Sequence, residues 1–230
     1  MSRDRNIRIK EDNDRLFESG AFDGMRSEFF SDLTPMKNPR REKFSVSANT
    51  VKMTTIACVL ENAGKKIIAL NFASAHKPGG GYVSGATAQE ESLCRASGLY
   101  YTIKDISGYY EQNGRHKLSD YTDGMIYSEN VPVVRDDSGA LLKTPVLCDF
   151  ITCPAVNKGA ANLPDSEVNA KMKQRIEKII TLAASKAPDI VILGAFGCGV
   201  FQNRREDVLP LFEAAINSYG GDIEYIFAIP

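Results

Sequence analysis

Apolar runs and helical patterns alternate along the chain, which is 230 residues long. The runs "IIALNFA" (67–73), "DIVILGAF" (189–196) and "IEYIFAIP" (223–230) are nearly continuous and predict buried strands. Another run, "TPVLCDFITCPAVN" (144–157), predicts a strand that ends at Pro154. Two less regular segments are also predicted as strands. "FSVSAN" (44–49) alternates apolar and polar residues, and 125–142 forms two short strands around Pro132 with a turn at "DDSG".

Helical segments are predicted between these strands, at 11–25, 50–66, 88–103, 165–187 and 205–221. Thr50 is the expected cap of the second and Gly64 its expected end. Asp165 or Ser166 is expected to cap the longest one, and Pro210 interrupts the last one early.

The alternation of strands and helices predicts an α/β fold with three layers and a mostly parallel sheet. The length fits a single domain over residues 1–230. Within it, residues 1–42 are expected to form a charged, partly helical extension that packs on the domain or flanks it.

Charge and composition exclude several classes of function. The formal net charge is −1, from 28 Lys and Arg against 29 Asp and Glu, so there is no basic excess for sequence-independent nucleic-acid binding. No apolar run approaches the roughly 18 residues of a membrane span, and no leader sequence is recognised. We therefore expect a cytoplasmic protein without a membrane anchor.

The cysteines and histidines do not suggest a metal site. The five cysteines are scattered without CxxC spacing, and the chain has only two histidines. This pattern is typical of reduced, buried thiols, not of a disulfide framework or a zinc site. A Cys–His nucleophilic pair is an alternative that the sequence leaves open.

Two glycine loops directly follow predicted strands. Gly79, Gly80 and Gly81 come after 67–73, and Gly197 and Gly199 come at the end of 189–196. Ligands of parallel sheets bind beyond the carboxyl ends of strands, and such loops offer backbone N–H groups to an anion. The two loops therefore predict a cleft that holds a diphosphate, with ordinary turns as the alternative. Neither loop matches a P-loop or a GxGxxG dinucleotide motif.

Two adjacent glutamates, Glu90 and Glu91, begin the helical segment after the first loop. Neighbouring residues of a helix point about 100° apart, so the two carboxylates are expected to have separate tasks. They are either favourable first-turn charges or, near a diphosphate, include a general acid with a raised pKa. The residues alone leave both interpretations open.

The segment "LNFASAHKPGGGYVSGATAQEESLCRASGLY" (70–100) resembles the signature of bacterial-type poly(ADP-ribose) glycohydrolases, in which GGG and QEE are separated by a short spacer. The similarity continues through "IYSENVPVVRDDSGALL", "ITCPAVNKGA" and "ILGAFGCGVFQN", and it spans residues 45 to 229. The fold that this resemblance implies is macrodomain-like, with a mixed, mostly parallel sheet between helices.

The resemblance also implies an activity and a set of site residues. The reaction is hydrolysis of the O-glycosidic ribose–ribose bond in poly(ADP-ribose) or in protein-linked ADP-ribose, without metal or cofactor. Glu91 would be the acid/base, Glu90 would hold ribose hydroxyls, and Gln89 would support the loop. The ligand-binding residues implied are Gly79, Gly80, Gly81, Gly197, Cys198, Gly199 and Val200 around the diphosphate, Phe201 near the distal ribose, and Asn49 near the adenine.

Two other functions compete with this interpretation. One is a macrodomain that binds ADP-ribose without turnover, and the intact QEE argues against it. The other is a nucleotide-binding regulatory protein unrelated to ADP-ribose, which the four ordered blocks argue against. The expected partner is ADP-ribose or its polymer on modified proteins. The sequence does not indicate the oligomeric state.

Overall fold

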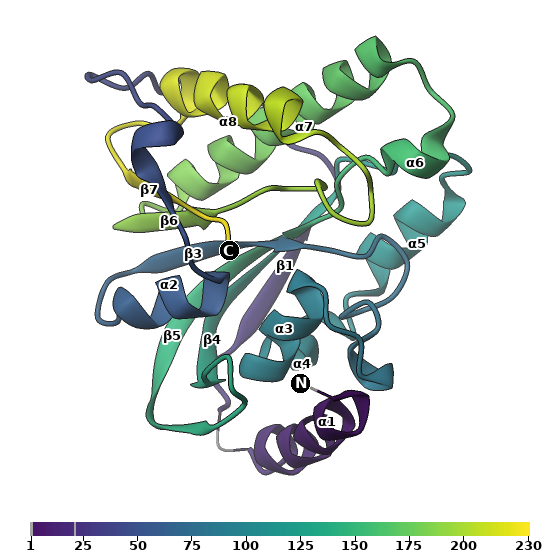
Figure 1. Cartoon of the computed structure of the whole chain (residues 1–230), viewed down its shortest axis with the longest axis vertical. Coiled ribbons are helices and arrows are strands. Elements are labelled where there is room, and N and C mark those ends of the chain that lie inside the picture. The colour runs from purple at the N-terminus through teal and green to yellow at the C-terminus, as the bar shows by residue number, and fades with distance from the viewer. Residues whose placement is uncertain (1, 21) are drawn as a thin grey trace.

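A mixed sheet of seven strands forms the centre of the computed structural model, which describes residues 2–20 and 22–230 (Figure 1). The strands are β1 (Arg26–Phe30), β2 (Thr50–Val51), β3 (Ile67–Phe72), β4 (Met125–Arg135), β5 (Leu141–Cys153), β6 (Ile190–Leu193) and β7 (Glu224–Ala228). Their order in the sheet is β1-β4-β5-β3-β6-β7-β2. The pairs β1–β4 and β4–β5 are antiparallel, and every other neighbouring pair is parallel. The predicted fold class is therefore confirmed.

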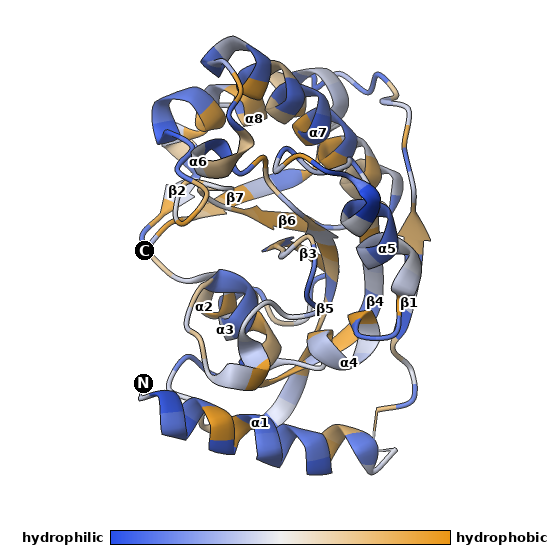
Figure 2. Ribbon diagram, turned by 90° about the vertical axis from the view of Figure 1, so that its right-hand side faces the viewer, coloured by the Kyte–Doolittle hydropathy of each residue, from blue (hydrophilic) through white to orange (hydrophobic). Residues whose placement is uncertain are grey.

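Helices cover both faces of the sheet (Figure 1). On one face lie α7 (Asp165–Ser185) and α8 (Arg205–Tyr219), and on the other lie α2 (Thr55–Glu61), α3 (Gln89–Ala96), α4 (Leu99–Ile103) and α5 (Ser107–Arg115). The shorter elements are α6 (Lys158–Ala161), η1 (Ser47–Asn49) and η2 (Tyr82–Ser84). Each face has its own cluster of buried apolar side chains. Figure 2 shows mostly hydrophobic strands at the centre and hydrophilic residues on the outer helices.

The helix α1 (Arg3–Glu18) lies outside this arrangement, against α3 and η2 (Figures 1 and 2). Strand β1 follows it and pairs with β4 at the edge of the sheet. The predicted N-terminal extension thus contributes both a packed helix and an edge strand. No helix within the described part of the chain is long and apolar enough to cross a membrane.

The segment 44–49, predicted as a strand, is not one. It ends in the 3₁₀ turn η1, and a short strand follows only at Thr50–Val51. Phe44 and Val46 are buried, which explains the alternating pattern, but their N–H groups donate to side chains of α8: Phe44 to Asn217 Oδ1 (2.8 Å) and Val46 to Glu213 Oε2 (2.9 Å). The segment therefore packs on a helix instead of pairing with a strand.

Three predicted helix boundaries and one predicted cap are also wrong. The helix expected over 11–25 is α1, which spans Arg3–Glu18. The N-cap position of α7 is Pro164, so neither Asp165 nor Ser166 caps this helix. The helix expected from Thr50 begins at Thr55, and Thr54 caps it by accepting from Ala57 N–H (3.0 Å). The helix expected over 88–103 breaks at Ser97–Gly98 into α3 and α4. There the Gly98 N–H donates to Pro132 O of β4 (3.0 Å), a long-range contact that no local pattern reveals.

The two short strands expected around Pro132 are one continuous strand, β4, with an irregular register after Ser128. It turns into β5 through Asp136–Gly139, as the "DDSG" motif predicts.

Candidate active site

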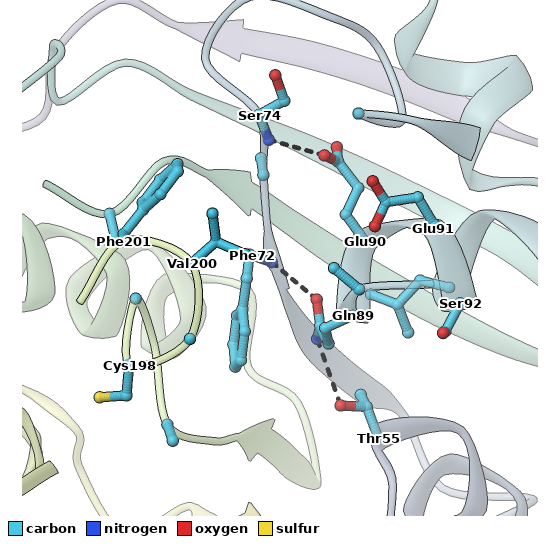
Figure 3. Close-up of a pocket in the computed structure, with 18 of the residues that line it drawn as sticks. Thr55, Phe72, Ser74, Gln89, Glu90, Glu91, Ser92, Cys198, Val200 and Phe201 are labelled. Carbon is cyan, nitrogen blue, oxygen red and sulfur yellow. Dashed lines mark hydrogen bonds between the residues drawn. The ribbon is translucent and has the colours of Figure 1, made fainter. Parts of the chain in front are cut away.

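A cavity of about 750 Å³ lies beyond the carboxyl ends of β3 and β6 (Figure 3). Its walls come from the first turns of α2 and α3, the loop 73–76 after β3, the loop 197–201 after β6, and the segment 228–230. Segments that follow β3 and β6 therefore meet at one cavity, as the two glycine loops predict. In each case the chain leaves a buried strand and continues into the cavity wall.

Glu90 is buried in the first turn of α3, with only 3% of its surface exposed. Its Oε2 accepts from Ser74 N–H at 2.7 Å, and its Oε1 accepts from Asn71 Nδ2 at 3.3 Å (Figure 3 shows the Ser74 bond). Burial raises the pKa of Glu90 to about 8, even though these two donors oppose the shift. The Glu91 charge beside it acts in the same direction as burial.

Glu91 is held differently from Glu90. Its Oε1 accepts from Gly81 N–H at 2.8 Å. Its Oε2 is buried and has no hydrogen-bond partner anywhere in residues 2–20 and 22–230. A buried carboxylate oxygen without a partner is costly unless a ligand completes it. Glu91 also lines the cavity, so one of its oxygens is fixed by the loop and the other is left without a protein partner next to the cavity.

The glycine triplet makes room for these carboxylates. A Cβ on Gly80 would lie 2.6 Å from Glu91 Oε1 and 3.0 Å from Glu90 Oε2, and the φ of Gly80 is +58°. A Cβ on Gly81 would lie 2.7 Å from Ala86 Cβ, and one on Gly79 would lie 3.0 Å from the Tyr100 ring. Any residue with a Cβ would create such a contact, so the loop needs glycine at each of the three positions.

The triplet was expected to approach a diphosphate, and the structure places it differently. Gly80 lines the cavity, whereas Gly79 and Gly81 are not among its walls. The Gly80 N–H donates to Lys77 O (2.9 Å) and the Gly81 N–H to Glu91, so neither amide is free for an anion. The triplet fixes Glu91 through the Gly81 N–H and leaves room at Gly80 for both carboxylates.

The second glycine loop has the free amides that an anion requires. Gly197, Cys198, Gly199, Val200 and Phe201 all line the cavity. Among the residues that the structure describes, nothing accepts from the N–H groups of Gly199, Val200 or Phe201. Arg205, the first residue of α8, lies on the same wall. Three backbone donors and a guanidinium together suit a phosphate group.

Cys198 has no features of a nucleophile. It is half-buried, and burial raises the pKa of its thiol to about 11. The thiol is therefore neutral at physiological pH, and reactivity requires the thiolate. A small loop residue is the better description of Cys198.

The structure places Gln89 in the cavity wall and Asn49 outside it. Gln89 accepts from Phe72 N–H (2.9 Å) and donates to Leu70 O (2.8 Å) and Thr55 Oγ1 (3.3 Å), so it ties α3 to β3 and α2 (Figure 3). These contacts fix the start of α3, and none of them reaches the glycine loop that Gln89 was predicted to support. Asn49 lies in η1, donates to Ser45 O (2.8 Å), and is not part of the cavity wall. The structure does not bring it to the site.

Several wall residues were not predicted. Phe72 is the last residue of β3, and Arg205 is the first residue of the helix after the second loop. Their positions next to the predicted loops would have indicated that both line the cavity. His76 and Tyr121 also line the cavity. Tyr121 comes from an irregular segment before β4 that carries no recognisable pattern.

The described residues contain no group of three or more His, Cys, Asp or Glu side chains that could hold a metal ion. The charged and ionisable wall residues include the carboxyl groups of Glu90, Glu91 and Asp137 and the guanidinium of Arg205, beside the free amides of the second loop.

Comparisons with known proteins agree with this geometry. The chain matches the family model described as microbial-type PARG, catalytic domain, over residues 3–136. A solved structure of poly(ADP-ribose) glycohydrolase (PARG) from Thermomonospora curvata, bound to the inhibitor ADP-HPD, is 30% identical with a TM-score of 0.82, and the match covers 99% of this chain and 93% of that one. PARG from Deinococcus radiodurans in complex with ADP-ribose is 34% identical with a TM-score of 0.76, over 92% and 89% of the two chains. A comparison with curated protein sequences gives no match.

Proposed function

Since the chain belongs to the family of microbial-type PARG catalytic domains and is a hydrolase of the PARG type, we propose that Glu91 is its catalytic acid/base. The proposed substrate is poly(ADP-ribose) or ADP-ribose linked to a modified protein, and the bond cleaved is the O-glycosidic bond of the terminal ribose. The reaction needs a proton donor for the departing oxygen and a base for the attacking water.

The observation that carries this proposal is that Glu91 lines the cavity while its buried Oε2 has no hydrogen-bond partner among the described residues. Protonated Glu91 gives its proton to the leaving oxygen as the C–O bond breaks and an oxocarbenium ion develops. The resulting carboxylate then takes a proton from water as that water bonds to the anomeric carbon. The Gly81 N–H on Oε1 keeps the carboxyl group oriented through both steps.

Glu90 competes for the role of acid because its pKa is about 8. However, each of its oxygens already accepts an N–H bond, from Ser74 and from Asn71. A carboxyl group fixed in this way suits the binding of ribose hydroxyls better than proton transfer. We therefore assign Glu90 to substrate positioning.

The loop 199–201 supplies the binding site for the diphosphate in this proposal. Its three residues with free N–H groups and Arg205 line the cavity on the side of β6 and α8. The diphosphate charge is then balanced by protein groups, and the leaving oxygen is protonated by Glu91. We accordingly propose that the reaction requires no metal ion.

The test measures release of ADP-ribose from poly(ADP-ribosyl)ated protein in buffer with EDTA. Glu91→Gln is expected to lower the turnover rate by about 10²- to 10⁴-fold, the usual contribution of a general acid or base. Calorimetry with ADP-ribose should show that Glu91→Gln still binds it. Glu90→Gln should weaken binding and raise KM.

Other outcomes would redirect the assignment. A larger rate loss in Glu90→Gln, with ADP-ribose binding intact, would transfer the acid role to Glu90. Tight binding of ADP-ribose without any release by the natural chain would contradict hydrolysis and support a binding domain. Release that stops in EDTA and returns with added metal would contradict the metal-free reaction.

A further inference from the structure

Three aromatic side chains, His76, Tyr121 and Phe201, lie close together in the cavity wall. Tyr121 lies with its ring centroid 5.4 Å from that of His76 and 5.9 Å from that of Phe201. All three residues line the cavity and come from separate loops, after β3, before β4 and after β6. The His76 N–H donates to Ser74 Oγ (3.3 Å), and the Ser74 N–H binds Glu90. Ser74 thus connects the aromatic cluster to Glu90.

Tyr121 is held in an unfavourable backbone conformation. Its φ is +56°, in the left-handed region that a bulky residue rarely adopts. The ring is only half-buried, so core packing does not account for its position. Non-glycine residues in this region persist where surrounding structure holds them, and they concentrate at functional sites.

Arg175 is the group that holds this segment. It comes from α7 on the far side of the sheet, and only 1% of its surface is exposed. Its guanidinium donates to Tyr121 O (3.1 Å), Asp120 O (2.9 Å) and Pro154 O (3.0 Å), and its Nε donates to Asp123 Oδ1 (3.0 Å). A buried charge with three backbone acceptors fixes the path of the chain at Tyr121.

We propose that Tyr121 is a substrate-contacting residue for the sugar end of ADP-ribose, and that Arg175 is the positioning residue that keeps it there. This inference rests on the proposed function for the identity of the ligand. A tyrosine ring packs against the C–H face of a ribose, and its hydroxyl both donates and accepts hydrogen bonds. The hydroxyl of Tyr121 has no partner among the described residues. It is therefore available to a ribose hydroxyl.

The test compares ADP-ribose affinity by calorimetry in Tyr121→Ala, Tyr121→Phe and the control Tyr219→Ala. Tyr219 is also half-buried but lies under Lys37, and it is not a cavity wall residue. We expect Tyr121→Ala to weaken binding about tenfold or more and Tyr121→Phe about twofold to tenfold, the range for one lost hydrogen bond. Tyr219→Ala should bind like the natural chain. Equal affinity of Tyr121→Ala and the natural chain would overturn the proposal.

The role of Arg175 is tested by a double-mutant cycle. Arg175→Met should weaken ADP-ribose binding in the natural background but add no further loss in Tyr121→Ala, because it acts through Tyr121. An equal loss in both backgrounds would make Arg175 merely structural. If Arg175→Met does not fold, Arg175→Lys provides the same comparison with the charge retained.

The measurements distinguish a wrong assignment of Tyr121 from a wrong assignment of the reaction. A natural chain that binds ADP-ribose but does not hydrolyse polymer contradicts the reaction, while the affinities of the Tyr121 variants still decide this proposal. A natural chain that does not bind ADP-ribose at all overturns both.

Discussion

At Gly80 the backbone passes between two carboxyl groups that come from the next helix. A Cβ at this position would lie 2.6 Å from Glu91 Oε1, which is closer than real contacts allow, and 3.0 Å from Glu90 Oε2, which is a tight contact. The same residue needs a left-handed φ of +58°. Because Glu91 is fixed by the amide of the following residue, Gly81, the glycine loop and the first turn of α3 act as one unit.

The replacement Gly80→Ala tests this unit. The new methyl group must displace at least one carboxylate, and alanine is strained at this φ, so we expect a loss of about 1–3 kcal/mol in the free energy of unfolding. Turnover should fall by at least about 10²-fold, since displacing the acid/base removes its contribution. Chemical denaturation and ADP-ribose release measure the two effects.

Gly114→Ala is the matched control. Gly114 lies in α5, is exposed, and has no atom within 4 Å of a Cβ built on it. This substitution should stabilise the protein by about 0.5–1 kcal/mol through helix propensity and leave turnover unchanged. If Gly80→Ala behaved like this control, the carboxylates would not depend on the glycine.

Among the helices and strands, the sequence predicts those that are determined by a local pattern of apolar residues. Strands β3, β6 and β7 were found because each is a short apolar run buried between helices, and the cleft followed because a glycine loop comes after two of them. Helices α7 and α8 were found from their periodicity, with Pro210 tolerated in the second turn of α8.

What could not be predicted depends on contacts between distant residues. The helix breaks at Ser97–Gly98 because the chain there pairs with β4, and the position takes glycine because a Cβ would lie 2.6 Å from Met25 Sδ. Tyr121 reaches the cavity because Arg175, more than fifty positions away, fixes its carbonyl. Only the family resemblance places Asn49 near the adenine, and the packing of 44–49 on α8 keeps Asn49 out of the cavity wall.

The helix α1 is joined to the site elements by buried polar side chains. Asn13 is fully buried, donates to Arg95 O at the end of α3 (2.9 Å) and to Tyr82 OH (3.3 Å), and accepts from Arg135 Nε of β4 (2.9 Å). One amide thus joins α1 to α3, η2 and the sheet. We propose that the N-terminal segment is an integral part of the catalytic domain.

Asn13→Ala should therefore destabilise the whole domain. It leaves buried polar groups on Arg95, Tyr82 and Arg135 without this partner, and an unsatisfied buried group costs about 1–3 kcal/mol. We expect a loss of about 2–4 kcal/mol in a single cooperative unfolding transition, measured by urea denaturation. Glu11→Ala, on the exposed face of the same helix, should change stability by less than about 0.5 kcal/mol. Equal effects, or a separate transition for α1, would show that the extension only flanks the domain.

For the molecule as a whole, charge is nearly balanced at a formal net value of −1. A polyanionic ligand is therefore not attracted by an overall positive field, and its recognition must come from local groups. In the proposed site these are the free amides of 199–201, which carry no net charge, and Arg205 at the start of α8. The start of α8, where the helix dipole is positive, lies at the same wall.

Substitutions of two neighbouring arginines distinguish a local contact between Arg205 and the diphosphate from a general effect of positive charge. Arg205 lines the cavity, whereas Arg204 is exposed and paired with Asp207 (2.7 Å) outside it. Arg205→Gln should weaken ADP-ribose binding about fivefold, because an exposed charge pair contributes about 1 kcal/mol, and Arg204→Gln should leave it unchanged. Calorimetry at low and high salt measures both. The difference between Arg205→Gln and the natural chain should shrink at high salt, where exposed charges are screened, while the binding carried by the amides persists. Equal weakening by the two variants would mean that the diphosphate responds to the net charge of this end of α8 and not to a contact with Arg205.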